Sequence, residues 1–399
     1  MVRQPAEKIR VLVDARQADR RDESRYEPNL VGALSRRDDI ALSILATPNA
    51  YDALRARGSI RNATYLEATE PPFSARGDFE LNRAYEHAEV DVFHSLRYCM
   101  PRRVRLDRPV IATIPDLVAL ADPLSMPDVL KRLVFAGRNR KALQRASWVI
   151  APTQATASDI KCFFPEIEVP ITVVPNAADD LGVTPLREPT VAGAYVLAPG
   201  TLRAHKNLET LIGAMDVLRS THPDIHLLLI GPRDRAWLKE QLGSYPTTKD
   251  LIHFTGQVDD ASLRAFYRDA RAFLLPSYAE GFAREALEAA AFSVPVIAAD
   301  VPALAETLKD AAVLVDPYDC TAWASAIGAV CDSEEYARDL GKKARTRAEL
   351  FSWERTAERT VDVYRDALVA LGTESSDNRT SVMPAEGIGQ GKDVGDPAL

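Results

Sequence analysis

The chain has 399 residues, of which 46% are hydrophobic and 27% charged, and its formal net charge is −8. This length predicts two to three domains with sizeable cores, and the negative charge argues against nucleic acid as a partner. No apolar run approaches the roughly 18 residues of a membrane-spanning helix. Charges interrupt the only candidate apolar segment near the N-terminus, so we expect no signal peptide.

The first half of the chain alternates short apolar, β-branched runs with helical patterns. These runs predict strands at residues 9–15, 40–46, 91–96, 109–114, 147–152 and 171–176. Such alternation is typical of a parallel sheet that is covered by helices on both faces. We therefore expect a doubly wound α/β domain at residues 1–178.

Residues 179–193 are rich in proline, glycine and charge, and we expect them to be an interdomain linker. The pattern then restarts, with strands expected at residues 194–200, 225–231, 251–256, 272–276 and 295–299 and helices at 207–219, 236–242 and 261–269. This predicts a second doubly wound domain at residues 194–352, followed by a last helix at 353–371. Residues 372–399 are polar and glycine-rich, which predicts a disordered tail. The tail contains GIGQG, but it follows no strand and opens no helix, so we do not expect it to bind a dinucleotide.

Four cysteines, Cys99, Cys162, Cys320 and Cys331, lie far apart and match no metal-ligand spacing. They are typical of thiols in a reducing cytoplasm. The chain also contains no Asp-x-Asp pair, so we expect no metal site.

Two glutamates of the second half are separated by seven residues. Glu280 follows the apolar run 272–276, and Glu288 lies on a helix that begins near Arg284. Eight steps of about 100° return to nearly the same helix face. Two carboxylates beside a helix N-terminus, which attracts anions, predict a pocket for a phosphorylated, hydroxyl-rich ligand.

A second cluster is PGTLRAHKNL at residues 199–208. A strand ends at Gly200, a short loop carries Arg203, His205 and Lys206, and a helix begins near Asn207. Backbone N–H donors and fixed positive charge are what a diphosphate needs. The plainer alternative is a solvated basic start of a helix.

The segment PSYAEGFAREALEAAAFSVPVIAAD at 276–300 resembles the motif of retaining glycosyltransferases of family 4, which have the GT-B fold. The resemblance implies two facing Rossmann-like domains with a cleft between them and a last helix that crosses back. It implies that Glu280 contacts the donor sugar and Glu288 the ribose, with Gly281, Phe282 and Ala283 between them; a structural cap or an ion pair is the alternative for Glu280.

The segment around Lys206 is similar to the family's diphosphate-binding loop, which includes Gly200, Thr201 and Asn207. The resemblance implies that Lys206 holds the diphosphate without a metal. His205 stands where the family has an arginine, so either Arg203 takes over that role or the diphosphate is bound more weakly.

The first domain departs from the family pattern. His94 takes the family's histidine position in DVFHSLRYCMP, where it is either a cleft residue or a core histidine. Pro115 replaces the histidine that in the family reaches the sugar, although Asp116 is kept. We expect Arg284, beside Ala283, to replace the lost contact, with His94 as second choice.

The sequence therefore predicts a cytoplasmic, retaining, metal-independent hexosyltransferase. Its partners would be a nucleoside diphosphate sugar and a glycan or lipid-linked acceptor, as in surface polysaccharide biosynthesis. The alternatives are a non-catalytic GT-B protein that binds a sugar nucleotide or a partner transferase, and another GT-B chemistry such as epimerisation. Basic stretches at 97–108 and 131–145 are either solvated arginines or a surface for anionic lipid or a phosphorylated acceptor.

Overall fold

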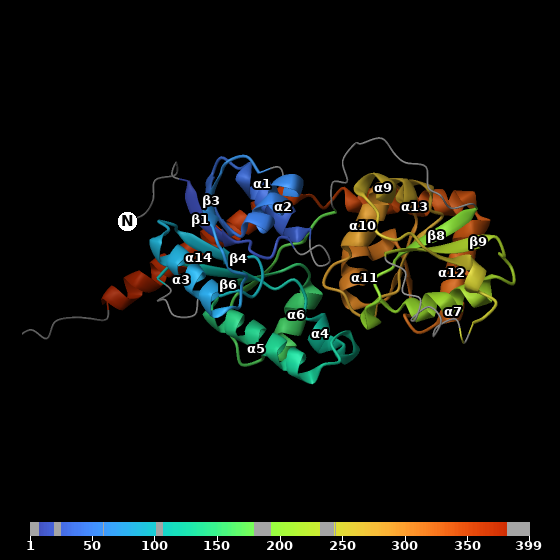
Figure 1. Cartoon of the computed structure of the whole chain (residues 1–399), viewed down its shortest axis with the longest axis horizontal. Coiled ribbons are helices and arrows are strands. Elements are labelled where there is room, and N and C mark those ends of the chain that lie inside the picture. The colour runs from blue at the N-terminus through green and yellow to red at the C-terminus, as the bar shows by residue number, and fades with distance from the viewer. Residues whose placement is uncertain are drawn as a thin grey trace, which may run out of the picture.

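The computed structural model of the chain describes residues 8–19, 25–58, 60–100, 107–178, 193–231, 243 and 245–380. Figure 1 shows two lobes side by side, and each is built around its own parallel sheet. The expected linker at 179–192 and the expected helix at 236–242 lie outside the described residues. The expected α/β class with two parallel sheets is confirmed.

The first sheet has seven parallel strands in the order β3-β2-β1-β4-β5-β6-β7. They are β1 (Ile9–Asp14), β2 (Ile40–Ala46), β3 (Ala63–Glu67), β4 (Val92–Ser95), β5 (Val110–Thr113), β6 (Trp148–Ala151) and β7 (Ile171–Val173). Along β1, Val11 and Val13 enter the core on one face, whereas Leu12 enters the core on the other. Burial on both faces explains why the strand sequences are nearly continuous apolar runs.

Helices cover both faces of this sheet. One core receives side chains from α1 (Tyr26–Ser35), α2 (Pro48–Gly58) and α14 (Trp353–Thr380). The other receives side chains from α3 (Ala75–His87), α5 (Val129–Arg145) and α6 (Gln154–Phe163). Two short elements, α4 (Val118–Ala121) and η1 (Pro123–Ser125), lead from β5 into α5.

The second sheet has six parallel strands in the order β10-β9-β8-β11-β12-β13. They are β8 (Ala194–Pro199), β9 (Ile225–Ile230), β10 (Ile252–Phe254), β11 (Phe273–Leu275), β12 (Val296–Ala299) and β13 (Val313–Val315). The helical elements are η2 (Ala204–Lys206), α7 (Leu208–Leu218), η3 (Lys249–Leu251), α9 (Asp260–Asp269), α10 (Arg284–Ala291), α11 (Pro302–Leu308), η4 (Lys309–Ala311), α12 (Cys320–Asp332) and α13 (Glu334–Ala348).

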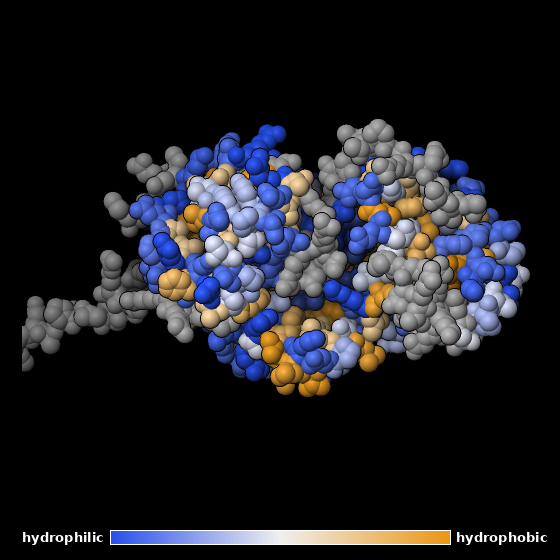
Figure 2. Space-filling model, viewed as in Figure 1, coloured by the Kyte–Doolittle hydropathy of each residue, from blue (hydrophilic) through white to orange (hydrophobic). Residues whose placement is uncertain are grey.

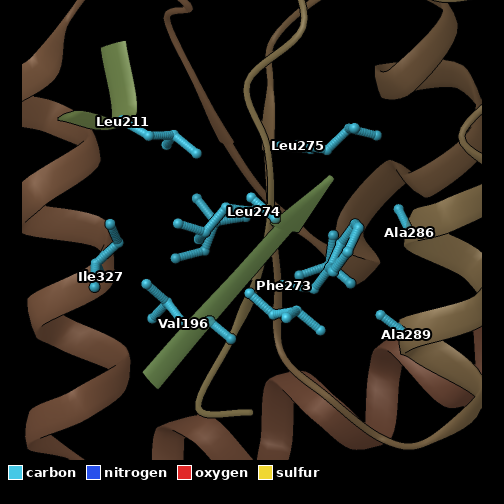
Figure 3. Close-up of a cluster of buried hydrophobic side chains, with 14 of the residues drawn as sticks. Val196, Leu211, Phe273, Leu274, Leu275, Ala286, Ala289 and Ile327 are labelled. Carbon is cyan, nitrogen blue, oxygen red and sulfur yellow. The ribbon is translucent and has the colours of Figure 1, made fainter. Parts of the chain in front are cut away.

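The core of the second lobe is packed from both sides of its sheet. Figure 3 shows Leu211 of α7 and Ile327 of α12 on one side of the strands and Ala286 and Ala289 of α10 on the other. The alanine side chains are small, so α10 can pack closely against β11. Phe273 of β11 belongs to the same core cluster as these alanines. This packing fixes where the two glutamates of α10 and its preceding loop lie.

The last helix, α14, packs against α1 in the first lobe. Its Trp353, Val361 and Tyr364 are part of that lobe's core. The helix extends to Thr380, nine residues beyond its expected end at residue 371. One glycine, Gly372, costs a helix only about 1 kcal/mol, which is too little to end it. The remaining tail, 381–399 with GIGQG, lies outside the described residues.

Two strands are absent from the sequence expectation. β3 is an edge strand whose Thr64 and Glu67 are exposed, and β13 has only three residues. Neither carries the long apolar run that marks a buried strand. Both complete sheets whose order reverses between β1 and β4 in one lobe and between β8 and β11 in the other. In doubly wound folds such reversal points are where ligands bind.

Candidate active site

Two loops meet at the reversal point of the second sheet. One follows β8 and leads through η2 into α7, and the other follows β11 and leads into α10. Gly200, at the start of the first loop, approaches β9 so closely that a Cβ would lie 2.8 Å from the carbonyl oxygen of Ile230. Its N–H donates to the same oxygen at 2.7 Å. Only glycine fits there, and this contact fixes where the loop leaves the sheet.

The ammonium of Lys206 lies between two carboxylates. Its Nζ is 2.7 Å from Glu280 Oε1 and 3.7 Å from Glu285 Oε1. The side chains of Lys206 and Glu280 are each only 11% exposed. Burial acts to lower the pKa of Lys206, but the charges of Glu280 and Glu285 outweigh burial and raise that pKa. Lys206 is therefore a permanent cation at the end of the central strands.

Glu285 is a site residue that the motif did not assign. Burial acts to raise its pKa, but the charges of Lys206 and Arg284 outweigh burial and hold the pKa below its usual value. The signal in the sequence was its place one residue after Arg284 in the first turn of α10, where an acidic side chain is favoured by the helix dipole.

Glu288 is on α10 and is 4% exposed. Its Oε2 accepts a hydrogen bond from Tyr267 Oη at 3.1 Å, and its Oε1 is 3.7 Å from Arg284 Nε. Arg284 is therefore directed along its own helix to Glu288. The hydroxyl of Tyr267, which the sequence did not single out, comes from α9 and orients the carboxylate.

The remaining residues of the β8 loop divide by exposure. Thr201 and Arg203 are exposed, whereas His205 and Asn207 are buried. Asn207 has a left-handed backbone with φ 52°, and its Nδ2 donates to the carbonyl oxygens of Pro276 and Pro317 at 3.0 and 2.7 Å. Its side chain thus ties three loops together. Burial lowers the pKa of His205, although Glu280 opposes that effect.

The two lobes touch at Gly281. A Cβ on Gly281 would lie 2.3 Å from the carbonyl oxygen of Pro115 and 2.7 Å from Asp116 Cβ. Thr153 Oγ1, from the first lobe, donates to the Gly281 carbonyl oxygen at 3.1 Å. The loop that carries Glu280 therefore lies directly against the segment of Pro115 and Asp116. Burial and the nearby charge of Glu280 raise the pKa of Asp116.

Phe282 and Ala283 are buried in the second-lobe core, at 8% and 0% exposure. The Phe282 ring also meets Phe351 edge-on, with centroids 5.7 Å apart. Their side chains hold the loop, so any ligand contact from them comes from the backbone.

His94 is completely buried in the first lobe. Its Nδ1 is 2.7 Å from Tyr364 Oη, and its Nε2 is 2.9 Å from Thr113 Oγ1. Burial lowers the pKa of His94 to about 3, so the ring is neutral. This geometry favours the core alternative over the cleft alternative, because both ring nitrogens bind protein groups.

Two further contacts of charged side chains were not predicted from the sequence: one lies within the first lobe, and the other joins the two lobes. Arg16 and Asp14 form a buried pair at 2.8 Å after β1. Glu306 of the second lobe accepts from the N–H groups of Gln154 and Ala155, at 2.8 and 3.0 Å, at the start of α6. A carboxylate at a helix N-terminus is favourable, so this contact helps to hold the lobes together.

In the described part of the chain, no group of three or more His, Cys, Asp or Glu side chains is placed to hold a metal ion. Cys99, Cys162, Cys320 and Cys331 are all free thiols. None of the described helices is both long enough and apolar enough to cross a bilayer.

Comparison with known proteins identifies the second lobe. Residues 190–347 match the family of glycosyl transferases group 1. This span holds both loops of the candidate site. Residues 190–347 form a group 1 glycosyltransferase domain. The family that the motif around Glu280 predicted is therefore confirmed.

Curated relatives extend the likeness of the group 1 domain. The D-inositol 3-phosphate glycosyltransferase of Paenarthrobacter aurescens is 29% identical over 259 residues, 58% of this chain and 60% of that protein. The MMP alpha-(1->4)-mannosyltransferase of Mycolicibacterium hassiacum is 27% identical, and the match covers 77% of this chain and 75% of that protein. O-antigen chain mannosyltransferase B of Escherichia coli is 27% identical and covers 69% and 74%. The chain thus spans less than two thirds of the first relative and more of the other two.

Solved structures share the arrangement of both lobes. Sucrose-phosphate synthase from Thermosynechococcus elongatus has a TM-score of 0.69 at 22% identity and covers 91% of this chain and 100% of that one. Anabaena HepE in complex with UDP-glucose has a TM-score of 0.67 at 17% identity and covers 90% and 100%. The expected GT-B fold is confirmed.

Proposed function

We propose that the chain is a retaining, metal-independent hexosyltransferase. It moves a sugar from a nucleoside diphosphate sugar to a glycan or lipid-linked acceptor in the assembly of a surface polysaccharide. One observation carries the proposal: Lys206 and Glu280 are 2.7 Å apart at the reversal point of the second sheet. A cation for the diphosphate and a carboxylate for sugar hydroxyls thus occupy one site.

Two comparisons support the finer parts of this proposal. HepE was solved with UDP-glucose, which supports a nucleotide-sugar donor. One relative is an O-antigen chain mannosyltransferase, which supports polysaccharide assembly. The proposed domains are an acceptor-side domain at 1–178 and a donor-side domain at 194–352, with helix 353–371 returning to the first. The free cysteines support a reducing cytoplasm.

Donor binding exchanges the partners of Lys206. In the free protein Lys206 is paired with Glu280 and Glu285. The diphosphate takes their place at the ammonium, with Arg203 and the N-terminal amides of α7 as further donors. Glu280 then accepts hydroxyls of the sugar. Glu288, held by Tyr267, accepts the ribose hydroxyls.

During transfer, the bond between the sugar and the diphosphate oxygen breaks, and negative charge grows on that oxygen. Lys206 and Arg203 neutralise this charge, a role that a fixed cation performs without reorganisation. The acceptor hydroxyl forms its new bond on the face that the diphosphate leaves, and its proton passes to the departing phosphate oxygen. The configuration at the sugar is therefore retained.

The first-lobe segment that contacts the Glu280 loop lacks a side-chain donor for the sugar. Pro115 has no side-chain donor, and its carbonyl oxygen faces Gly281. This observation favours the second candidate, a GT-B protein that binds a sugar nucleotide or a partner transferase without catalysis. Arg284 is our candidate for the missing donor, since a change of its partner from Glu288 to the sugar would bring it into the cleft.

Calorimetry with UDP, GDP and ADP in the presence of a chelator tests donor binding. A transfer assay with the radiolabelled sugar of the nucleotide that binds then tests activity. We expect metal-free nucleotide binding and transfer to a glycan or lipid-linked acceptor, with the sugar's configuration retained in the product by NMR. Binding without transfer to any acceptor would favour the second candidate, and an absolute requirement for a divalent metal would contradict the proposed chemistry.

A further inference from the structure

The first half of α5 exposes large apolar side chains on one face. Leu130 is 71% exposed, Leu133 64% and Val134 44%. Spacings of three and four residues place these three side chains side by side on the helix. Val129, 57% exposed, and Leu124 of η1, 65% exposed, adjoin them. These five residues, hereafter the α5 patch, are five of the eleven large apolar residues that are exposed in the described part of the chain.

The patch is visible as a gathering of apolar atoms at the lower edge of the molecule in Figure 2, where Figure 1 places α4 and α5. Single exposed apolar side chains are normal on protein surfaces, but a contiguous group of them marks an interaction site. The apolar side chains of α5 that pack inward are Phe135, Ala142 and Leu143, and the patch residues of α5 are left exposed.

The segment that carries the patch has an excess of positive charge. Residues 121–145 contain six lysines and arginines and two aspartates, in a chain whose net charge is −8. Lys141 continues the stripe of Leu130, Leu133 and Val134 along the exposed face, and the side chain of Lys131 is 76% exposed. Apolar side chains flanked by lysines are typical of a helix that lies in the surface of an anionic bilayer.

Three arginines of α5 are used within the lobe. Arg132 donates to the carbonyl oxygen of Met126 at 3.0 Å, Arg138 lies over the Phe73 ring, and Arg140 pairs with Glu166 at 2.9 Å. These contacts anchor the helix and turn its apolar face outward. Lys131 lies within the patch and forms an exposed ion pair with Asp128 at 3.8 Å, and Lys141 lies about two helical turns beyond Val134.

The patch also adjoins the candidate active site. η1, which carries Leu124, contacts η2, which carries Lys206. The charge of Asp122, next to η1, acts on His205 of the same loop. A surface that contacts the patch would therefore lie beside the loop that carries Lys206.

We propose that the α5 patch, with Lys131 and Lys141, docks the protein on an anionic lipid bilayer. The apolar side chains enter the interface between head groups and acyl chains, and the two lysines meet the lipid phosphates. That a lipid-linked acceptor reaches the cleft by this route rests on the proposed function. The docking itself does not, since it needs neither donor nor acceptor.

The test is sedimentation of the full chain with vesicles, without any nucleotide. We expect binding to vesicles of phosphatidylcholine and phosphatidylglycerol in equal parts, weakening as salt is raised, and weaker binding to phosphatidylcholine alone. Leu130→Ser with Leu133→Ser should reduce binding to both kinds of vesicle by roughly tenfold or more, since each substitution removes apolar surface that the bilayer would bury. Lys131→Gln with Lys141→Gln should reduce binding to the anionic vesicles by roughly fivefold per lysine. Val217→Ser with Val369→Ser is the matched control, because these valines are exposed on other helices, and it should bind like the wild type.

The proposal is overturned if the wild type does not sediment with anionic vesicles, or if the leucine variant binds as well as the wild type. It is also overturned if light scattering shows a dimer that the leucine variant splits, because the patch then covers a second copy. Calorimetry with nucleoside diphosphates on the same samples separates the two proposals. Nucleotide binding and transfer without vesicle binding would leave the proposed function standing, and vesicle binding without nucleotide binding would leave the docking standing.

Discussion

Lys206 Nζ lies 2.7 Å from Glu280 Oε1, so the cation proposed for the diphosphate and the carboxylate proposed for the sugar are paired with each other in the structure. Both side chains are largely buried, and removal of one partner from such a pair leaves an uncompensated charge. A donor that offers phosphate to Lys206 and hydroxyls to Glu280 satisfies both groups at once. Neither the nucleotide nor the sugar alone would do so.

Lys206→Gln should weaken the binding of nucleoside diphosphates by about 1.5–3 kcal/mol, the range for a hydrogen bond to a charged group. Calorimetry in chelator measures the change. Arg219→Gln is the control, since it removes an exposed cation just after α7 and should leave binding unchanged. Equal binding by Lys206→Gln and the wild type would show that the diphosphate lies elsewhere.

Glu280→Gln and Glu288→Gln should separate sugar recognition from nucleotide recognition. Glu280→Gln removes the strongest competitor for Lys206, so the bare nucleotide should bind at least as well while transfer falls sharply. Glu288→Gln should weaken the binding of the nucleotide itself. Tyr267→Phe should weaken it to a smaller degree, because the hydroxyl of Tyr267 orients Glu288. Calorimetry and a transfer assay measure both effects. If the two glutamate variants change nucleotide binding alike, our assignment of their roles is wrong.

Gly281→Ala should lower the free energy of unfolding by about 1–3 kcal/mol, as overpacking does, and should reduce transfer. The added methyl would lie 2.3 Å from the Pro115 carbonyl oxygen, so the lobes must shift apart. Gly137→Ala on α5 is the matched control, because nothing lies within 4 Å of its Cβ position. It should stabilise the protein by about 0.5–1 kcal/mol. Urea titration measures both, and a Gly281→Ala variant as stable and active as the wild type would contradict the close contact.

Arg284→Ala should abolish transfer if Arg284 supplies the donor that Pro115 lacks. Loss of one hydrogen-bond donor to a transition state costs roughly 10²–10³ in rate. Pro115→His in the Arg284→Ala background should then restore part of the activity. Full activity of Arg284→Ala would remove Arg284 from the mechanism. A wild type without transfer, together with donor hydrolysis by Pro115→His, would indicate a scaffold that has lost its catalytic group.

His94 should make the protein lose stability in acid. Burial lowers its pKa from 6.5 to about 3, so between these pH values His94 is protonated in the unfolded chain and neutral in the folded chain. The contribution is fully present above pH 6.5 and is lost as the pH falls toward 3, at up to about 1.4 kcal/mol per pH unit. His94→Gln should flatten this dependence in urea titrations between those pH values. If the free energy of unfolding of His94→Gln falls with pH as steeply as that of the wild type, other groups cause the loss of stability in acid.

The sequence predicted the parts of the site that depend on short spacings. Glu288 could be placed on a helix because its segment has helical periodicity, whereas Glu280 lies in the loop before α10. Lys206 could be placed at a strand end because Gly200 and Asn207 bound its loop. The sequence did not predict that Lys206 and Glu280 pair, since they come from loops separated by 74 residues. It left His94 open between core and cleft, and only its contacts with Thr113 and Tyr364 favour the core.

By itself, then, the sequence determined the α/β class, the family of the second lobe and the loops that line its site, because apolar periodicity and loop chemistry act over short distances. It also showed the positive charge of α5. The tertiary structure decided which face of α5 stays exposed, which charges neutralise each other and where the lobes touch at Gly281 and Pro115. Those outcomes depend on how distant segments pack, since a side chain's exposure and electrostatic partners are set by neighbours that the chain brings together only on folding.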